Sequence, residues 1–142
     1  MVLAKQSNWK KVLKADPTDW LLEPDDPWVR YLDIVEADAS ELASAKKVAH
    51  TSSPIAEVLS KIDNDGFWVK AGAGYFPMYT GTVWSVILLV QLGATIDMDK
   101  RIATACDYIL DHSLTKYGQF TASGTPAGTL DCLQGNLCYS RD

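Results

Sequence analysis

The sequence has few of the residues that usually bind metals or form disulfides. Among its 142 residues are two histidines, His50 and His112, which lie far apart, and three cysteines, Cys106, Cys132 and Cys138. These spacings are not those of a zinc site or a disulfide framework. We therefore predict no metal, no cofactor, and reduced thiols in a cytoplasmic protein. Cys106 falls on the apolar stripe of a predicted helix, so we expect it to be buried and unreactive.

The sequence also lacks an excess of positive charge and a long apolar segment. Its net charge is -5 and its pI is near 4.9, whereas nucleic-acid-binding domains usually carry a basic patch. The longest apolar run, within residues 80–93, is shorter than the roughly 20 residues of a membrane helix. Polar residues follow Met1 almost at once, so we expect no apolar signal region there. We expect neither nucleic acid nor a membrane span.

Residues 80–93 form the segment around which the other elements are expected to pack. Thr80 or Thr82 is the predicted N-cap, and Gly93 is the predicted C′ residue of the helix. Nearly every side chain between these ends is apolar, so the helix has no polar face. A helix of this kind must be enclosed. We predict that the rest of the chain, or another subunit, surrounds it.

The remaining pattern indicates helices and turns, with no β-strand pattern. The other predicted helices are residues 4–15, a helix starting at Asp26 and Pro27, residues 40–48, residues 53–62, residues 98–112 with a cap at Asp97, and residues 131–137. Trp20 to Leu22 are expected in a connector. We predict a single all-α domain over 1–142, with an N-terminal helix and connector in 1–24 and helical-pair repeats in 25–142.

An internal repeat joins two glycine-containing loops. Gly66 is followed by Trp68, and 52 residues later Gly118 is followed by Phe120. The start of the apolar helix and the start of the last predicted helix are separated by the same offset. Each repeat then has an amphipathic outer helix, a glycine-aromatic loop and a more buried inner helix. This alternation is typical of an α/α toroid or a helical-pair solenoid.

Several motifs together resemble those of a known group of proteins. They are Glu-Pro-Asp-Asp-Pro-Trp-Val-Arg-Tyr at 23–31, Asp-Gly-Phe-Trp at 65–68, Tyr-Thr-Gly-Thr-Val-Trp-Ser at 79–85 and Asp-Cys-Leu-Gln-Gly-Asn at 131–136. In these motifs the chain resembles uncharacterised prenyltransferase and squalene-cyclase-like repeat proteins from about residue 20 onward. The resemblance implies the α/α toroid of terpenoid cyclases and protein prenyltransferases, whose cavity takes isoprenoid chains. The chain supplies fewer helical pairs than a closed ring, so the resemblance implies an incomplete toroid that corresponds to an N-terminal part.

Aromatic residues in and after the first glycine loop are the first candidate site. Trp68, Tyr75, Tyr79 and Trp84 are more aromatic side chains than a solvated loop requires. One explanation is ordinary packing between helix ends. The other is a concave apolar pocket for a hydrophobic small molecule.

Asp131 and Cys132 are the second candidate site. In protein prenyltransferases, which the chain resembles, the zinc ligands are an Asp and a Cys two residues apart and a distant His. Here Asp131 and Cys132 are adjacent and no His follows them. They are either a helix cap and a small buried residue, or the remnant of a catalytic site at a helix N-terminus, where a thiolate is favoured.

The sequence therefore supports two functional hypotheses. The first is a prenyltransferase/cyclase-like helical-repeat protein that binds an apolar ligand or a protein partner. The alternative is an enzyme, or a truncated enzyme, acting on an isoprenoid or lipid-like substrate with Asp131 and Cys132 near the reacting atoms. The residues leave open whether the chain is catalytic.

Self-association follows from the expected shortage of cover for the apolar helix. The side chains in question are Val83, Val86, Ile87, Leu89 and Val90. Leaving half of them in water forfeits favourable burial, at roughly 25 cal/mol per Å². We therefore predict a homo-oligomer, most simply a two-fold dimer. Alternatively, the N-terminal segments with Trp9, Trp20 and Trp28 form a lid over the helix, which permits a monomer.

Overall fold

The computed structural model describes residues 12–23, 27, 29, 39–51 and 54–139. Within these ranges the chain is helical and contains no strand, only two isolated β-bridges between loop residues. The predicted all-α class is confirmed for this part of the protein. None of the helices described is long and apolar enough to cross a membrane.

The chain divides into two compact units, Met1–Lys46 and Lys47–Asp142. The first unit contains α1 (Thr18–Leu21), and α3 (Ala39–Thr51) begins in it. The backbone N–H of Thr18 donates to Asp16 Oδ1 at 3.0 Å, which starts α1. The expectation of a connector at Trp20 and Leu21 is therefore wrong, because Asp16 and Pro17 begin a helical turn here.

Two other predictions for the N-terminal region fall largely outside the described residues. Of the predicted helix over 4–15, only 12–15 are described, and these form turns and bends. Of the helix expected to start at Asp26, residues 27 and 29 are described, and both are helical. The predicted helix over 40–48 is confirmed as α3. The predicted single domain over 1–142 stays a prediction.

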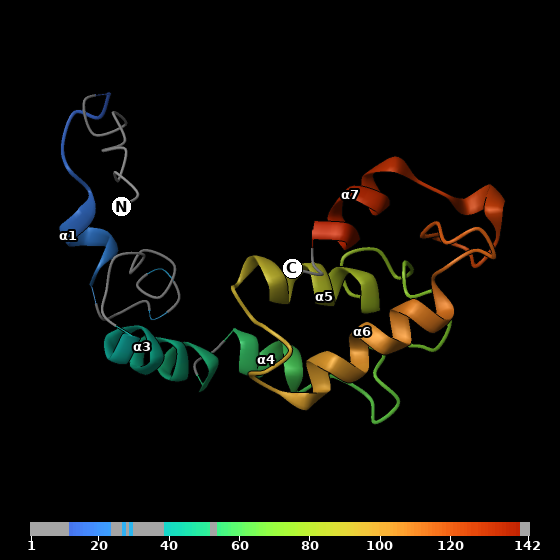
Figure 1. Cartoon of the computed structure of the whole chain (residues 1–142), viewed down its shortest axis with the longest axis horizontal. Coiled ribbons are helices and arrows are strands. Elements are labelled where there is room, and N and C mark those ends of the chain that lie inside the picture. Colours follow the sequence, from blue (N-terminus) through green and yellow to red (C-terminus); the bar gives the residue numbers. More distant parts are fainter. Residues whose placement is uncertain (1–11, 24–26, 28, 30–38, 52–53, 140–142) are drawn as a thin grey trace. The chain divides into compact units, whose positions relative to one another are not determined.

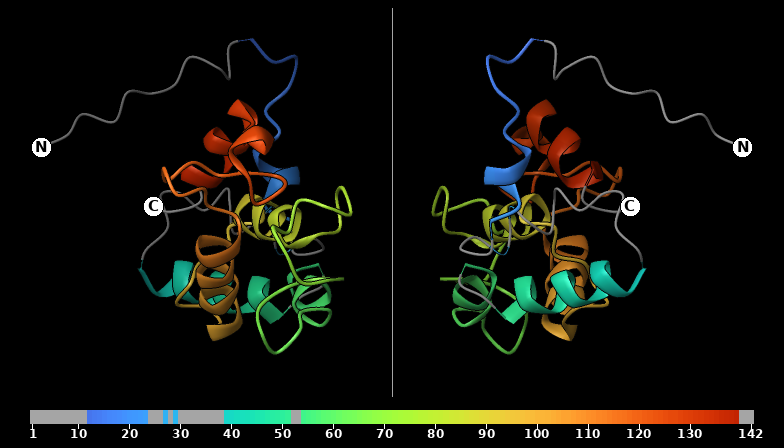
Figure 2. Two further views of the ribbon diagram at one scale, coloured as in Figure 1. Left: turned by 90° about the vertical axis from the view of Figure 1, so that its right-hand side faces the viewer. Right: turned by 90° about the vertical axis from the view of Figure 1, so that its left-hand side faces the viewer.

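The second unit consists of α4 (Ile55–Leu59), α5 (Thr82–Gln91), α6 (Lys100–His112), the 3-10 turn η2 (Pro126–Gly128) and α7 (Asp131–Tyr139). Helix α5 packs against α4, α6 and α7. Figures 1 and 2 show α6 and α7 on opposite sides of α5. The apolar helix is thus at the centre of its unit, as the sequence predicts.

The two ends of α5 are made differently. At the C-terminus Gly93 has φ +74°, and the N–H groups of Gly93 and Ala94 donate to Val90 O (2.8 Å) and Leu89 O (2.9 Å). This is a Schellman motif, which confirms Gly93 as the C′ residue. At the N-terminus the cap is Gly81, without a side-chain cap bond. The predicted threonine cap is wrong because the Thr82 hydroxyl is used elsewhere, as described below.

The chain itself encloses most of α5. Val83, Val86 and Leu89 are buried, and Ile87 and Val90 are half-buried. Leu88 is 42% exposed and Trp84 is half-buried one turn before it. Leu88 is therefore the most exposed apolar residue of α5 among those that we expected to need cover or that lie beside them, and the predicted self-association stays a prediction.

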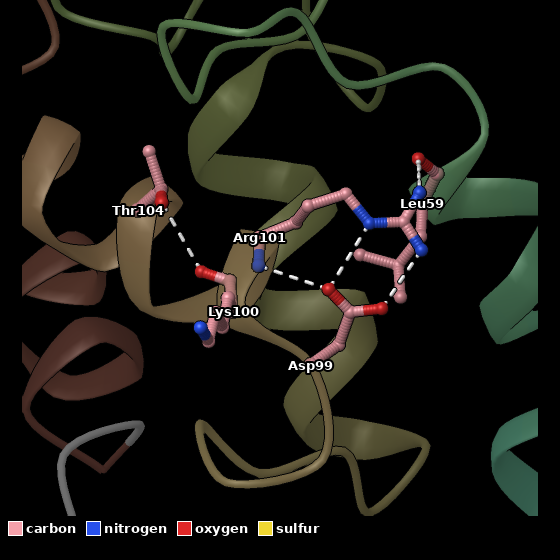
Figure 3. A network of polar contacts seen from close by, with 5 residues as sticks. All are labelled: Leu59, Asp99, Lys100, Arg101 and Thr104. Carbon is pink, nitrogen blue, oxygen red and sulfur yellow. Dashed lines mark hydrogen bonds and ion pairs between the residues drawn. The ribbon is translucent and has the colours of Figure 1, made fainter.

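Arg101 ties the start of α6 to the end of α4 (Figure 3). Its Nη1 donates to Leu59 O at 2.9 Å, and its Nη2 pairs with Asp99 Oδ2 at 2.8 Å. Asp99 Oδ1 also accepts the backbone N–H of Arg101 at 2.9 Å, so Asp99 is the N-cap. The sequence placed this cap at Asp97. It falls two residues later because residues 95–98 form a turn closed by the Met98 N–H and Thr95 O.

The predicted repeat is present as a repeated set of hydrogen bonds. We call residues 63–68 the first glycine loop and residues 115–120 the second glycine loop. In the first, Asp63 N–H donates to Phe67 O (2.8 Å) and Gly66 N–H donates to Asp63 O (3.0 Å). The bonds at the same offset of 52 are present in the second, from Thr115 to Gln119 (2.8 Å) and from Gly118 to Thr115 (2.9 Å). Both glycines have positive φ, +93° and +77°.

The repeat extends to the bonds between each loop and its inner helix. The backbone N–H of Trp68 donates to Thr82 Oγ1 at 3.1 Å, and that of Phe120 donates to Gln134 Oε1 at 2.8 Å. Donors and acceptors are again 52 residues apart. Both aromatic rings are buried. Each repeat therefore fixes its aromatic residue by an acceptor in the first turns of the following helix.

Candidate functional site

Three of the four predicted aromatic site residues lie together, and Phe76 lies beside one of them. We call Tyr75, Phe76, Tyr79 and Trp84 the aromatic cluster. The ring of Trp84 lies 5.3 Å from that of Tyr75 and 5.0 Å from that of Tyr79, centroid to centroid. Tyr75 and Phe76 meet edge to face at 5.0 Å. These spacings and tilted angles are those of favourable aromatic pairs.

The cluster is held by α5 and by the loop before it. Trp84 Nε1 donates to Tyr75 O at 2.8 Å, which fixes both the indole ring and the loop backbone. Tyr79 has φ +67°, an unfavourable conformation for a bulky residue. Such strain persists only where the surrounding structure imposes it, and it is frequent at functional sites. The cluster is thus built by specific contacts.

The outer part of the cluster is open to solvent. Tyr79 is 75% exposed and Phe76 is 54% exposed, and Met78 between them is also exposed. Leu88, one turn after Trp84 on the same face of α5, extends this apolar surface along the helix. Several large apolar side chains are therefore exposed together beside ordered rings.

Trp68, the fourth predicted residue, has a different position. Its side chain is 3% exposed, and its Nε1 donates to Val58 O at 2.8 Å. With the bond from its N–H to Thr82, it connects α4, the first glycine loop and α5. Trp68 is therefore a core residue and does not belong to the aromatic cluster.

Asp131 and Cys132 both lie in the first turn of α7, with exposed side chains. The expectation that Cys132 is a small buried residue is wrong, because Leu133 and Leu137 supply the buried face of the helix. Among the residues described, no three His, Cys, Asp or Glu side chains are grouped so as to hold a metal ion. The catalytic assignment of Asp131 and Cys132 stays a prediction.

The structure contains a pocket that sequence reasoning missed. It is open, with a volume of about 430 Å³, and lies between the first glycine loop and α6. Its lining includes Asp65, Phe67, Thr104, Asp107, Tyr108, Asp111 and His112. The carboxylates make it acidic, while Tyr108 stacks on His112 at 4.0 Å and lies 5.5 Å from Phe67. The spacing of Asp107 and Asp111 was the available signal, since residues four apart share a helix face.

Cys106 is half-buried on α6, rather than fully buried as predicted. Burial raises the pKa of its thiol, and the neighbouring Asp107 carboxylate raises that pKa further. Both effects disfavour the thiolate, which is the reactive form. The side chain therefore suits a packing role.

Comparisons of the chain with family models, curated proteins and solved structures found no match. Its function is therefore inferred from its own residues. The acidic pocket presents charged oxygen atoms, whereas the aromatic cluster presents a fixed apolar surface. Of the two, the aromatic cluster contains three of the four residues that the sequence analysis offers as candidates, either for ordinary packing or for a hydrophobic ligand.

Proposed function

We propose that this protein is a helical-repeat binding protein of the prenyltransferase/squalene-cyclase-like kind, and that its aromatic cluster contacts an apolar ligand such as an isoprenoid chain. The repeated hydrogen bonds of the two glycine loops support the repeat architecture. In this proposal α4 and α6 are outer helices, α5 and α7 are inner helices, and together they form part of an incomplete α/α toroid. The protein is cytoplasmic and self-associates.

The observation that carries this proposal is the exposure of aromatic rings on the loop before the central helix, beside the half-buried Trp84 of that helix. An exposed side chain normally gains little by being fixed, yet the exposed ring of Tyr79 lies 5.0 Å from Trp84, which is itself anchored by a hydrogen bond to Tyr75 O. Contiguous exposed apolar surface on a soluble protein commonly marks a ligand or partner site. Aromatic rings supply large contact area with few rotatable bonds, so a ligand loses little affinity to ordering them.

The proposal is tested by direct binding of farnesol, a prenyl alcohol, in equilibrium dialysis against the full chain. We expect saturable binding that weakens at least about tenfold in Tyr79→Ala, because this side chain is 75% exposed and supplies ring area that a ligand can contact. Dodecanol, a straight chain of similar size, shows whether the surface prefers the branched isoprenoid shape.

Tyr117→Ala is the matched control. Tyr117 is 68% exposed, close to the 75% of Tyr79, but it lies in the second glycine loop outside the aromatic cluster. We expect its affinity for farnesol to equal that of the wild-type chain. Equal losses in both variants, or no saturable binding of either alcohol, would contradict the proposed role of the cluster.

A further inference from the structure

The acidic pocket of the second unit has two walls. One is the first glycine loop, with Asp65 and Phe67, and the other is α6, with Asp107, Asp111 and His112. Its volume of about 430 Å³ lies in the range of small-molecule sites. All of its lining residues lie between positions 65 and 112, so its walls do not depend on residues near either end of the sequence.

The three carboxylates of this pocket have no basic partner. Among the residues that the structure describes, no lysine or arginine pairs with Asp65, Asp107 or Asp111. In contrast, Glu57 and Asp99 each pair with a basic residue at 2.8 Å. Asp107 and Asp111 are four residues apart on α6, a spacing at which like charges destabilise a helix. A bound cation would relieve this repulsion.

Aromatic rings beside these carboxylates give the pocket an apolar wall. His112 stacks on Tyr108 with 4.0 Å between ring centroids and 11° between ring planes, and Phe67 lies 5.5 Å from Tyr108. His112 Nδ1 donates to Tyr108 O at 2.9 Å, because a carbonyl oxygen can only accept. The neutral imidazole therefore has Nε2 as an acceptor. The pocket thus combines hydrogen-bond acceptors with ring faces, against which methylene groups next to a positive charge pack well.

We propose that this pocket binds a linear aliphatic polyamine. Its ammonium groups pair with the carboxylates, and its methylene groups pack against Phe67 and His112. Asp107 and Asp111 are about 6 Å apart along the α6 axis, close to the span of four methylene groups between two ammonium groups. A third ammonium group reaches Asp65 on the opposite wall.

The arrangement of the carboxylates favours an extended cation over a compact one. Within the described part of the chain, no three His, Cys, Asp or Glu side chains are grouped so as to hold a metal ion. The negative charge is instead distributed over the loop and α6, with the rings beside it. Carboxylates alone would attract any cation, so the rings supply the preference for an organic one.

This inference does not rest on the aromatic cluster or its apolar ligand and is tested without one. Isothermal titration calorimetry of the full chain with spermidine, a triamine, should show saturable binding of one molecule per chain. Putrescine, a diamine with four methylene groups, should bind at least about threefold more weakly, because it leaves one carboxylate unpaired. Magnesium chloride at the same ionic strength should show no saturable binding.

A chain that carries both Asp107→Asn and Asp111→Asn should bind spermidine at least about tenfold more weakly. Both side chains are exposed, so the packing of α6 should be kept. Spermidine should raise the thermal unfolding midpoint of the wild-type chain but not that of this variant, because a ligand stabilises only the folded state that binds it.

Asp63→Asn is the matched control. Asp63 is exposed in the same loop as Asp65 but does not line the pocket, and the asparagine oxygen can still accept the Asp65 N–H, now 3.0 Å from Asp63 Oδ1. We expect its affinity for spermidine to change less than about twofold. The proposal would be overturned by a lack of saturable spermidine binding, by magnesium binding to the same site, or by equal losses in Asp63→Asn and the doubly substituted chain.

Discussion

Comparison of the first and second glycine loops shows how far the backbone conformation of a loop depends on its surroundings. Both close the same bonds from residue 63 or 115 and both place an aromatic ring in the core, yet among the described residues of this unit only the first is covered by a helix. The backbone conformation is therefore set inside each repeat, by short bonds within the loop and by hydrogen bonds to a side chain of the inner helix. Cover by a neighbouring outer helix adds packing without changing the loop.

The largest expected effect on stability is the difference between substitutions at Gly66 and at Gly118. Gly66→Ala places a Cβ against the Thr104 backbone at positive φ, so strain and overpacking should cost about 2–5 kcal/mol of unfolding free energy. Gly118→Ala meets no neighbour among the described residues and should cost about 1–2 kcal/mol from positive φ alone. Urea unfolding measures both. Equal losses would mean that the two loops are covered alike.

A second comparison concerns the acceptors on the inner helices. Thr82 is buried, so Thr82→Val would leave the Trp68 N–H without its partner and should cost about 1–3 kcal/mol. Gln134 accepts from the Phe120 N–H and also donates its Nε2 to Phe120 O at 2.6 Å, so Gln134→Leu breaks both bonds. Gln134 is half-buried, so water can replace both partners, and we expect a loss of about 1 kcal/mol. Thermal unfolding of both variants gives the order. A larger loss of stability for Gln134→Leu than for Thr82→Val would show that water does not reach the second loop as its exposure indicates.

The link between the outer helices should have a smaller effect. Arg101→Met removes the bonds to Leu59 O and Asp99 but keeps the aliphatic stem, and should cost about 1 kcal/mol because the side chain is half exposed. Lys61→Met, which breaks the exposed pair with Glu57 on the preceding outer segment, is the control and should leave stability almost unchanged. Identical midpoints for both variants and the wild-type chain would show that Arg101 does not connect α4 and α6.

The smallest effect is chemical and compares α6 with α7. Burial and Asp107 raise the pKa of Cys106, so at pH 8 this thiol should be less ionised than an ordinary cysteine and react slowly. Cys132 and Cys138 on α7 are exposed and should be labelled first. Labelling with a thiol-specific disulfide reagent should show two fast thiols and one slow thiol, and the slow rate should rise as pH increases. Three equal rates would contradict the packing of α6.

Much of the fold could be predicted from patterns that act over short distances. The sequence was enough to predict the apolar run of α5, Gly93 at its end and the spacing of 52 between the loops. Helix periodicity and glycines at positive φ leave a local signal in the sequence. The cap of α6 was misplaced from Asp99 to Asp97, because both carboxylates suit a cap and only the turn at 95–98 distinguishes them. Part of the aromatic cluster was also predicted, but Trp68 was not separated from it.

The sequence by itself determined the helical class, the central place of α5 and the repeated loop, since each follows from the order of apolar, polar and glycine residues along the chain. Only the tertiary structure decided which equivalent positions are covered. Trp68 became a core residue through its bond to Val58 O, while Tyr79 stayed exposed. Gly66 was enclosed by α6 and Gly118 was left open. Burial depends on which helices come together across the chain, and a local pattern shared by two loops does not contain that information.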